Sequence, residues 1–157
     1  MNNIFSKNHI LFLLAVAFLS FIIWGLFGQK DTASVKGQTE KTVLVSIGQA
    51  RITAFVADTD ALRAKGLGDR DSIPPDAGML FVFGTPGEYS FWMKDMRFPI
   101  DMIWIGADGR VVFEKENVSP ATFPEIFTPN APAKYVLEAN AGFAEKNGVK
   151  IGSSVSF

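Results

Sequence analysis

The sequence predicts a mainly β domain, an antiparallel sandwich or barrel with two short helices, preceded by one N-terminal transmembrane or signal helix. Three observations indicate this. Short runs rich in β-branched and aromatic residues recur through residues 42–157, separated by Gly, Pro, Asn and Asp. Only two stretches there have the length and end signals of a helix. An uncharged apolar run of 18 residues extends from Ile10 to Phe27.

The N-terminal apolar run has the length of a membrane span. As a helix, 18 residues would measure about 27 Å, close to the hydrocarbon thickness of a bilayer. The run is longer than a usual signal-peptide core, and no Ala-x-Ala site follows it. We therefore expect a signal anchor over residues 1–28, with a cleaved signal peptide as the alternative. The membrane is then a partner, and the rest of the chain is periplasmic or extracellular, or secreted if the signal is cleaved.

The remainder divides into a flexible linker, residues 29–41, and a β domain, residues 42–157. The linker is polar and contains Gly, Ser and Thr, as tethers do. The chain has no Cys and its one His is His9, so the domain has neither residue. This composition excludes Ser-His-Asp and Cys-His catalysis and His- or Cys-ligated zinc or haem, and we predict no cofactor. Residues 41–157 carry 12 basic and 14 acidic side chains, so no nucleic-acid partner is expected.

The first half of the domain should begin with a hairpin and continue through a short helix into a strand. Asp58 or Thr59 can cap the helix and Gly66 can end it. The expected elements are strands Thr42–Ile47 and Arg51–Val56 around Gly48-Gln49, a helix ending at Lys65, and a strand Met79–Phe83 before the turn at residues 84–87.

The second half should add further strands and one more helix. Four prolines between Asn117 and Ala133 predict an irregular surface excursion, and a loop of that length often covers a site. The expected elements are strands Tyr89–Lys94, Ile100–Ile105, Val111–Lys115 and Lys134–Ala139, a helix capped by Asn140 and ended by Gly148, and a strand Ser153–Phe157.

Five motifs between Val43 and Val155 resemble the DUF192 family. In chain order they are Lys65-Gly66-Leu67, Gly78-Met79-Leu80-Phe81-Val82-Phe83, Phe91-Trp92-Met93-Lys94, Pro99-Ile100-Asp101, and the run Tyr135–Gly142. The chain departs from the family pattern at Gly68, where Met is usual, and at Met96-Arg97-Phe98, where a small polar residue is more usual. The resemblance implies a jelly-roll-like β fold, often exported behind a signal or anchor segment. It implies no established activity.

The segment from Phe91 to Asp101 is the densest in groups that could bind a ligand. It holds two cations, two carboxylates and several aromatic rings within eleven residues. As a strand it would place Trp92 and Lys94 on the same face. A structural role is the alternative, with Trp92 half-buried and Lys94 paired with Asp101.

Two carboxylates fall within apolar strand patterns. Asp101 shares a strand face with Ile103, and Glu138 lies between Leu137 and Ala139. A carboxylate in such surroundings must find partners or raise its pKa. We therefore include both in the ligand-binding candidates, which are Arg63, Trp92, Lys94, Asp101 and Glu138. Each carboxylate could instead cap backbone amides or pair with Lys94, Arg63 or Arg97.

These residues favour a non-catalytic binding or interaction module of the cell envelope. Its ligand could be a small polar molecule, an envelope glycan or an envelope protein. One alternative is a glycosidase-like hydrolase with Asp101 and Glu138 as the catalytic pair. Another is a Cu(I)-binding protein, since thioethers suit this soft ion and Met93 and Met96 lie close in the sequence, although Met is also a common core residue.

Overall fold

The computed structural model describes residues 40–157, so the predicted signal anchor and residues 29–39 of the predicted linker lie outside the described residues. Within residues 40–157, no helix has both the length and the apolar character needed to cross a membrane.

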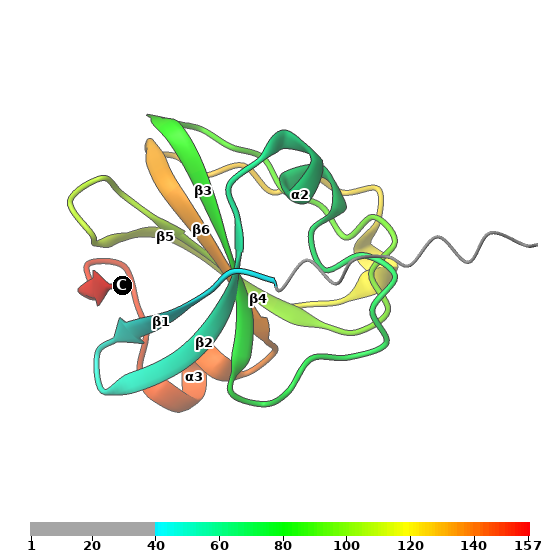
Figure 1. Cartoon of the computed structure of the whole chain (residues 1–157), viewed down its shortest axis with the longest axis horizontal. Helices are drawn as coiled ribbons and strands as arrows, with labels where there is room; N and C mark the ends of the chain where they lie inside the picture. Colours follow the sequence, from blue (N-terminus) through cyan, green and yellow to red (C-terminus); the bar gives the residue numbers. More distant parts are fainter. Residues whose placement is uncertain (1–39) are drawn as a thin grey trace, which may run out of the picture. The chain divides into compact units, whose positions relative to one another are not determined.

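Seven strands form one sheet in the order β5-β4-β6-β3-β2-β1-β7 (Figure 1). Their bounds, in chain order, are β1 Thr42–Ile47, β2 Ala50–Ala57, β3 Ala77–Gly87, β4 Ile100–Ile105, β5 Val111–Val118, β6 Ala133–Asn140 and β7 Val155–Ser156. Two short α-helices, α2 (Asp60–Lys65) and α3 (Phe143–Asn147), and a 3-10 turn η1 (Pro120–Thr122) complete the elements. The prediction of a mainly β domain with two short helices is confirmed.

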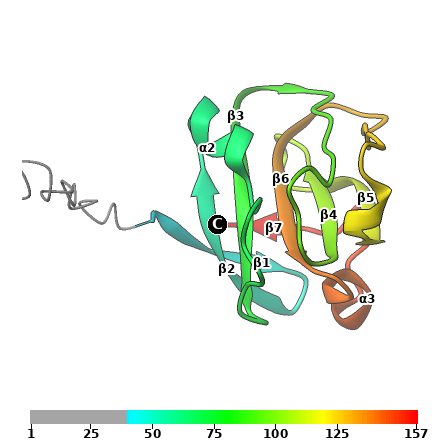
Figure 2. The same cartoon turned by 90° about the vertical axis from the view of Figure 1, so that its right-hand side faces the viewer.

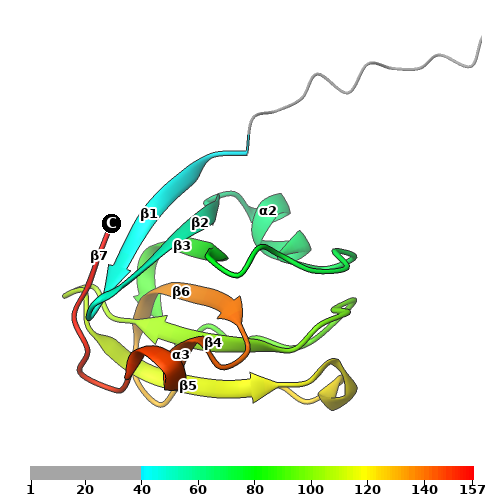
Figure 3. The ribbon, with the colours of Figure 1, turned by 90° about the horizontal axis from the view of Figure 1, so that it is seen from below.

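The sheet is mixed, which corrects the purely antiparallel prediction. Strands β2 and β3 are parallel, with Val56 opposite Leu80, whereas all other neighbouring strands are antiparallel. The difference arises because the chain leaves β2 through α2 and a long loop and re-enters the sheet in the same direction. Such a crossover yields a parallel pair, and a hairpin cannot. Figures 2 and 3 show the sheet curled into a half-barrel, with β2 and β3 on one side and β6, β4 and β5 on the other.

The two edges of the curled sheet meet at one end. Strand β7 pairs with β1, and the residues before it bond to the turn between β4 and β5. The Val155 N–H donates to the Gly109 carbonyl at 2.7 Å, and the Val111 N–H donates to the Ser153 carbonyl at 3.0 Å. These bonds therefore join β5 and β7, the first and last strands in the order of the sheet.

The sequence signals locate both ends of α2 and the C-terminal end of α3, but not the start of α3. The Thr59 hydroxyl accepts a hydrogen bond from the Leu62 N–H at the start of α2, and Gly66 follows its last residue. Helix α3 begins after Gly142 rather than Asn140, and its first amides bond to a side chain from β4, described below. Gly148 ends α3 in the left-handed conformation, with φ of 61°, as expected of a C-terminal glycine.

The predicted strand Tyr89–Lys94 is wrong. This segment makes one isolated bridge, between Phe91 and Phe127, and otherwise lies outside the sheet. Its chain neighbours β3 and β4 are already flanked by strands on both edges, so neither has a free edge to which the segment could pair. It instead packs Phe91 and Met93 against one face of the sheet.

Both faces of the central strands β4, β6 and β3 are buried. The Glu138 face, named for its one carboxylate, carries the residues Met79, Phe81, Met102, Trp104 and Val136. The Asp101 face carries Leu80, Ile103, Ile105, Leu137 and Ala139, which pack with side chains of β1, β2, α3 and β7. Alternation along each strand assigns successive residues to opposite faces.

Three long connections cover the Glu138 face. They follow α2, β3 and β5, and contribute Leu67, Ile73, Met93, Phe98 and Phe127 to the core on this face. The Asp69 N–H donates to the Asp95 carbonyl at 2.8 Å, so the first two connections are in direct contact. Figures 1 and 3 show all three gathered at one end of the sheet, away from the turn between β4 and β5.

Two glycines of β3 provide a matched test of the central packing. A Cβ on Gly78 would lie 2.5 Å from the Glu138 carbonyl oxygen and 3.0 Å from Ile52 Cδ1, whereas one on Gly84 would meet nothing within 4 Å. We expect Gly78→Ala to lower the free energy of unfolding by about 1–3 kcal/mol, because the extra methyl must push strands apart. Gly84→Ala should leave it within about 0.5 kcal/mol. Chemical denaturation measures both; equal effects would contradict this packing.

Candidate functional site

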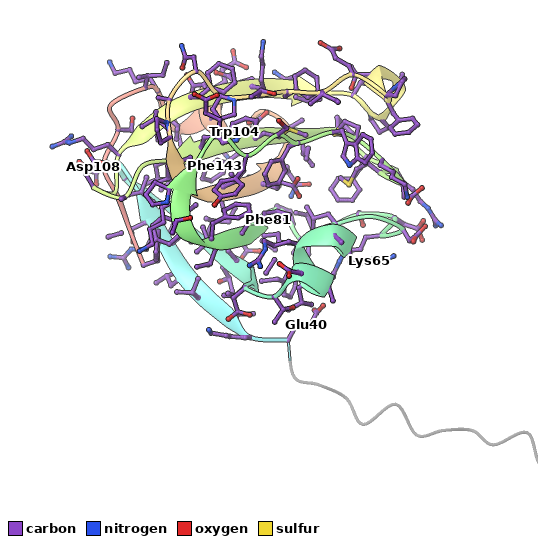
Figure 4. All side chains as sticks on the ribbon, turned by 90° about the horizontal axis from the view of Figure 1, so that it is seen from above. Glu40, Lys65, Phe81, Trp104, Asp108 and Phe143 are labelled. Carbon is purple, nitrogen blue, oxygen red and sulfur yellow. The ribbon has the colours of Figure 1, made fainter. Side chains whose placement is uncertain are left out.

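A cavity of about 520 Å³ lies between α2 and the segment that leads from β3 toward β4. Aromatic rings from β3 and this segment, Phe81, Phe91 and Trp92, line it together with the cations Arg63, Lys65 and Lys94 and the carboxyl group of Glu138. In Figure 4, Phe81 lies in the interior and Lys65 lies on α2 near the periphery, with Asp108 at the opposite end of the domain. The cavity is thus at the end where the long connections gather.

Glu138 is the buried acid of this cavity. On β6 it lies directly between Met79 of β3 and Met102 of β4, and it is only 4% exposed. Its Oε2 atom is buried without a hydrogen-bond partner. Burial disfavours the charged form and raises the pKa of Glu138 to about 8. At neutral pH the cavity therefore contains a protonated carboxylic acid, which can donate a hydrogen bond.

Arg63 is held rigidly at the α2 side of the cavity. Its guanidinium donates to the Val82 carbonyl at 2.7 Å and to Asp60 at 2.5 Å, and it lies 5.4 Å from the centroid of the Phe83 ring. Because Val82 belongs to β3, these contacts tie the helix to the sheet. They also fix a positive charge beside the phenylalanine rings that line the cavity, Phe81, Phe83 and Phe91, which we call the aromatic wall.

Trp92 and Lys94 lie on the opposite side of the cavity and are half-exposed. The Trp92 ring is 5.7 Å from the Phe123 ring, centroid to centroid, and the Trp92 side chain is 48% exposed. Lys94 pairs with Asp95 at 2.5 Å, and this contact raises the pKa of the lysine. The expected pair between Lys94 and Asp101 does not form, because Asp101 lies elsewhere.

The turns beside the cavity have an unusual backbone. Asp69 and Asp95 have left-handed φ angles of 65° and 58°, a conformation that Asp tolerates better than most residues. A Cβ on Gly68 would lie 3.1 Å from the Lys65 carbonyl oxygen and 3.5 Å from Asp95 Cβ, so a larger residue there would crowd the adjoining turn. Backbone strain of this kind is typical of functional sites.

Asp101 is a structural residue rather than a member of the cavity. It is fully buried on the other face of the sheet, where it accepts backbone hydrogen bonds from Asn117 at 2.8 Å, Gly142 at 3.2 Å and Ala144 at 2.8 Å. The carboxylate thereby joins β4 to the end of β5 and to the start of α3. This is the capping role that the sequence left as an alternative.

The proposed catalytic pair is therefore corrected. In the sheet register Asp101 is opposite Ala139 and Glu138 is opposite Met102, so the two carboxylates point to opposite faces. Both Asp101 oxygens already accept backbone hydrogen bonds. Because a glycosidase pair must flank one bond in one cleft, Asp101 and Glu138 cannot act together.

The two methionines proposed for Cu(I) differ in position. Met93 is buried in the core on the Glu138 face, whereas Met96 is partly buried and lines the cavity. Within residues 40–157, no group of three or more His, Cys, Asp or Glu side chains is arranged to hold a metal ion.

The structure thus places four of the five candidate ligand-binding residues, Arg63, Trp92, Lys94 and Glu138, on one cavity. Sequence reasoning missed the aromatic wall and Lys65. The aromatic residues occupy positions typical of core strands, and no local spacing relates α2 to the segment near residue 92. Lys65 did, however, belong to the first motif that resembled DUF192.

The structural role of Asp101 can be tested with an isosteric change. Asp101→Asn replaces one acceptor oxygen by an NH₂ group facing backbone donors, so we expect a loss of about 2–4 kcal/mol in the free energy of unfolding. The control is Asp58→Asn, at an exposed pair with Lys41, which should leave the free energy of unfolding almost unchanged. Denaturant titration of both variants checks this, and equal losses would count against it.

The raised pKa of Glu138 predicts a pH dependence of stability. Below pH 4.5 the residue is protonated in both states; between there and about pH 8 only the unfolded state loses the proton. Stability should then fall with rising pH by up to about 1.4 kcal/mol per pH unit, and level off above pH 8. Glu138→Gln should remove this decline. Denaturation from pH 5 to 9 measures the difference between the two proteins. Burial also raises the pKa of Glu114, but this residue is present in both proteins and its contribution cancels.

Comparison with known proteins places the chain in a family. The family profile of DUF192, described as "Uncharacterized ACR", matches residues 43–157. A crystal structure described as a candidate transcription regulator of Sinorhizobium meliloti is 33% identical with a TM-score of 0.70, over 74% of this chain and 94% of that one. A protein of unknown function from Novosphingobium aromaticivorans is 30% identical with a TM-score of 0.71, over 78% and 89%. No curated protein matches the chain. The chain belongs to the DUF192 family.

Proposed function

We propose that this protein is a non-catalytic binding module whose ligand is a small molecule held in the cavity between α2 and the Ser90–Met96 segment. The observation that carries the proposal is the Glu138 carboxyl group, which is buried at this cavity with an oxygen that has no partner. A buried polar group without a partner costs about 1–3 kcal/mol. A ligand that hydrogen-bonds to the Glu138 carboxyl group would remove this cost.

The form of the cavity also supports a binding role. Its volume of about 520 Å³ is within the range of small-molecule sites, which are mostly apolar with a few polar groups that fix orientation. Here the apolar part is the aromatic wall that includes Phe81 and Phe91, and the polar groups are Glu138 and the cations at the opening. Trp92, exposed beside the opening, offers a flat face to a ring or a sugar.

Membrane anchoring and export belong to the same proposal. The uncharged run from Ile10 to Phe27 would hold the domain at the outer face of the cytoplasmic membrane, or direct its secretion if it is cleaved. The ligand would then be a small polar molecule or envelope glycan met in that compartment. The net charge of −1 of this chain gives no basic footprint for DNA, so DNA is not among the proposed ligands.

A ligand screen on residues 40–157 tests the proposal. Both hydrophobic clusters lie within this range, and the two crystallised relatives are matched over 94% and 89% of their own lengths, so the fragment contains a complete folding unit. We expect thermal-shift screening with sugars, peptidoglycan fragments and small organic acids to give at least one stabilising compound. Its effect should be lost in Glu138→Leu and reduced in Trp92→Ala and Lys94→Ala.

The control is Lys150→Ala, an exposed lysine that does not line the cavity, and it should bind as the unchanged domain does. A compound that stabilises Glu138→Leu, Trp92→Ala and Lys94→Ala as much as the unchanged domain binds elsewhere. That result would show that the cavity is not the binding site. A screen in which no compound shifts the unfolding temperature would contradict the proposal as a whole.

A further inference from the structure

The charged groups around the cavity are predominantly basic. Of the charged side chains that line it, Arg63, Lys65 and Lys94 are cations, whereas Asp95 is the one exposed carboxylate and Glu138 is the one buried acid. Each cation is paired with a carboxylate, Arg63 with Asp60, Lys65 with Asp69 and Lys94 with Asp95. Of these carboxylates only Asp95 lines the cavity, so a cationic ligand inside it would meet more positive than negative side chains. An anionic ligand would gain from the same arrangement.

Lys65 and Lys94 can exchange their present carboxylate partners for an anionic group of a ligand with little loss of free energy. Lys65 pairs with Asp69 and Lys94 with Asp95, and in both pairs the two side chains are more than half exposed. Ion pairs of this exposure contribute little to stability, so a ligand anion can replace or share the carboxylate partner. Arg63 is different, since its bonds to Val82 and Asp60 keep its charge in place whether or not a ligand is present.

The buried end of the cavity, at Glu138, suits a neutral group rather than an anion. The protonated Glu138 carboxyl can donate one hydrogen bond, and its neighbours Met79, Met102 and Phe81 supply no good acceptor. A second negative charge placed there would be desolvated beside an acid that resists ionisation. A neutral oxygen acceptor, such as an ether, carbonyl or hydroxyl oxygen, fits the site.

We infer that the ligand is a small organic monoanion, with its charged group among Arg63, Lys65 and Lys94 and a neutral oxygen acceptor against Glu138. Its apolar body packs on Phe81 and Phe91. This inference rests on the proposed function and adds the class and orientation of the ligand. Amines, neutral sugars and polyanions are thereby excluded as best ligands, the polyanions because a second negative charge beside the buried Glu138 would be desolvated.

The test uses matched compounds and calorimetry on residues 40–157. The panel consists of aromatic and alicyclic monocarboxylates that carry an ether or carbonyl oxygen, each with its carboxamide. One set is 4-methoxybenzoate, 4-methoxybenzamide and 4-ethylbenzoate, the last lacking only the oxygen acceptor. We expect the best carboxylate to bind about tenfold more tightly than its amide and than its acceptor-free analogue. Lys65→Ala and Lys94→Ala should remove the preference for the acid over the amide.

Variants at Glu138 test the orientation of the ligand. Glu138→Gln keeps a hydrogen-bond donor, so it should bind the carboxylate with similar affinity, whereas Glu138→Leu should bind about tenfold more weakly. For the unchanged domain, affinity should fall between pH 7 and pH 9 as Glu138 ionises, and it should stay level in Glu138→Gln. The charged groups that share the cavity, Arg63, Lys65, Lys94 and Asp95, are present in both proteins and cancel in the comparison.

The outcomes separate the two proposals. If an amide of the panel, or a sugar of the thermal-shift screen, binds as tightly as any carboxylate, and Glu138→Leu weakens that binding, the cavity is a binding site but the inferred ligand class is wrong. The ligand class is also wrong if no carboxylate binds. If carboxylates bind with no effect of Glu138→Leu, or if neither the panel nor the thermal-shift screen yields a compound that binds, both the ligand class and the proposed function are overturned.

Discussion

Strand β6 runs between β4 and β3, and the burial of both faces of these three strands is the constraint on which the rest of the structure depends. A polar side chain in such a sheet has no access to water and must be satisfied by the protein. Asp101 meets this requirement with three backbone N–H groups, and in doing so it fixes the end of β5 and the start of α3. Glu138, on the opposite face, has an oxygen with no protein partner.

Asp101 and Glu138 differ in what surrounds their carboxyl groups. Both are buried, both lie in apolar strands, and adjacent register positions bring their backbones close together. Only the immediate surroundings differ. One carboxylate is surrounded by amides and serves the fold, whereas the other borders a cavity with cations at its opening. Among the described residues, Glu114 and Glu138 each have one buried carboxylate oxygen without a partner, and of the two only Glu138 lines this cavity.

Much of the fold could be predicted from local patterns. Alternation and turn residues located β1, β2, β4 and β5, and the capping signals located α2. The segment Tyr89–Lys94 has strand-like residues but packs on the sheet, since strand status depends on a free edge and no local pattern reveals one. The parallel pairing of β2 with β3 was not predicted either, because no local pattern shows in which direction the chain re-enters the sheet. Asp101 and Glu138 were both recognised as unusual, but which face each occupies relative to a cavity follows only from the assembled sheet.

The meeting of the sheet edges near Gly109 and Val155 has a consequence for the behaviour of the domain in a crowded compartment. An exposed strand edge can recruit strands of other chains and so begin aggregation. Here the backbone groups around Val111, at the start of one edge strand, are bonded to the residues that lead into the other. The curl that encloses the core on the Asp101 face thus also reduces the length of backbone available for such pairing.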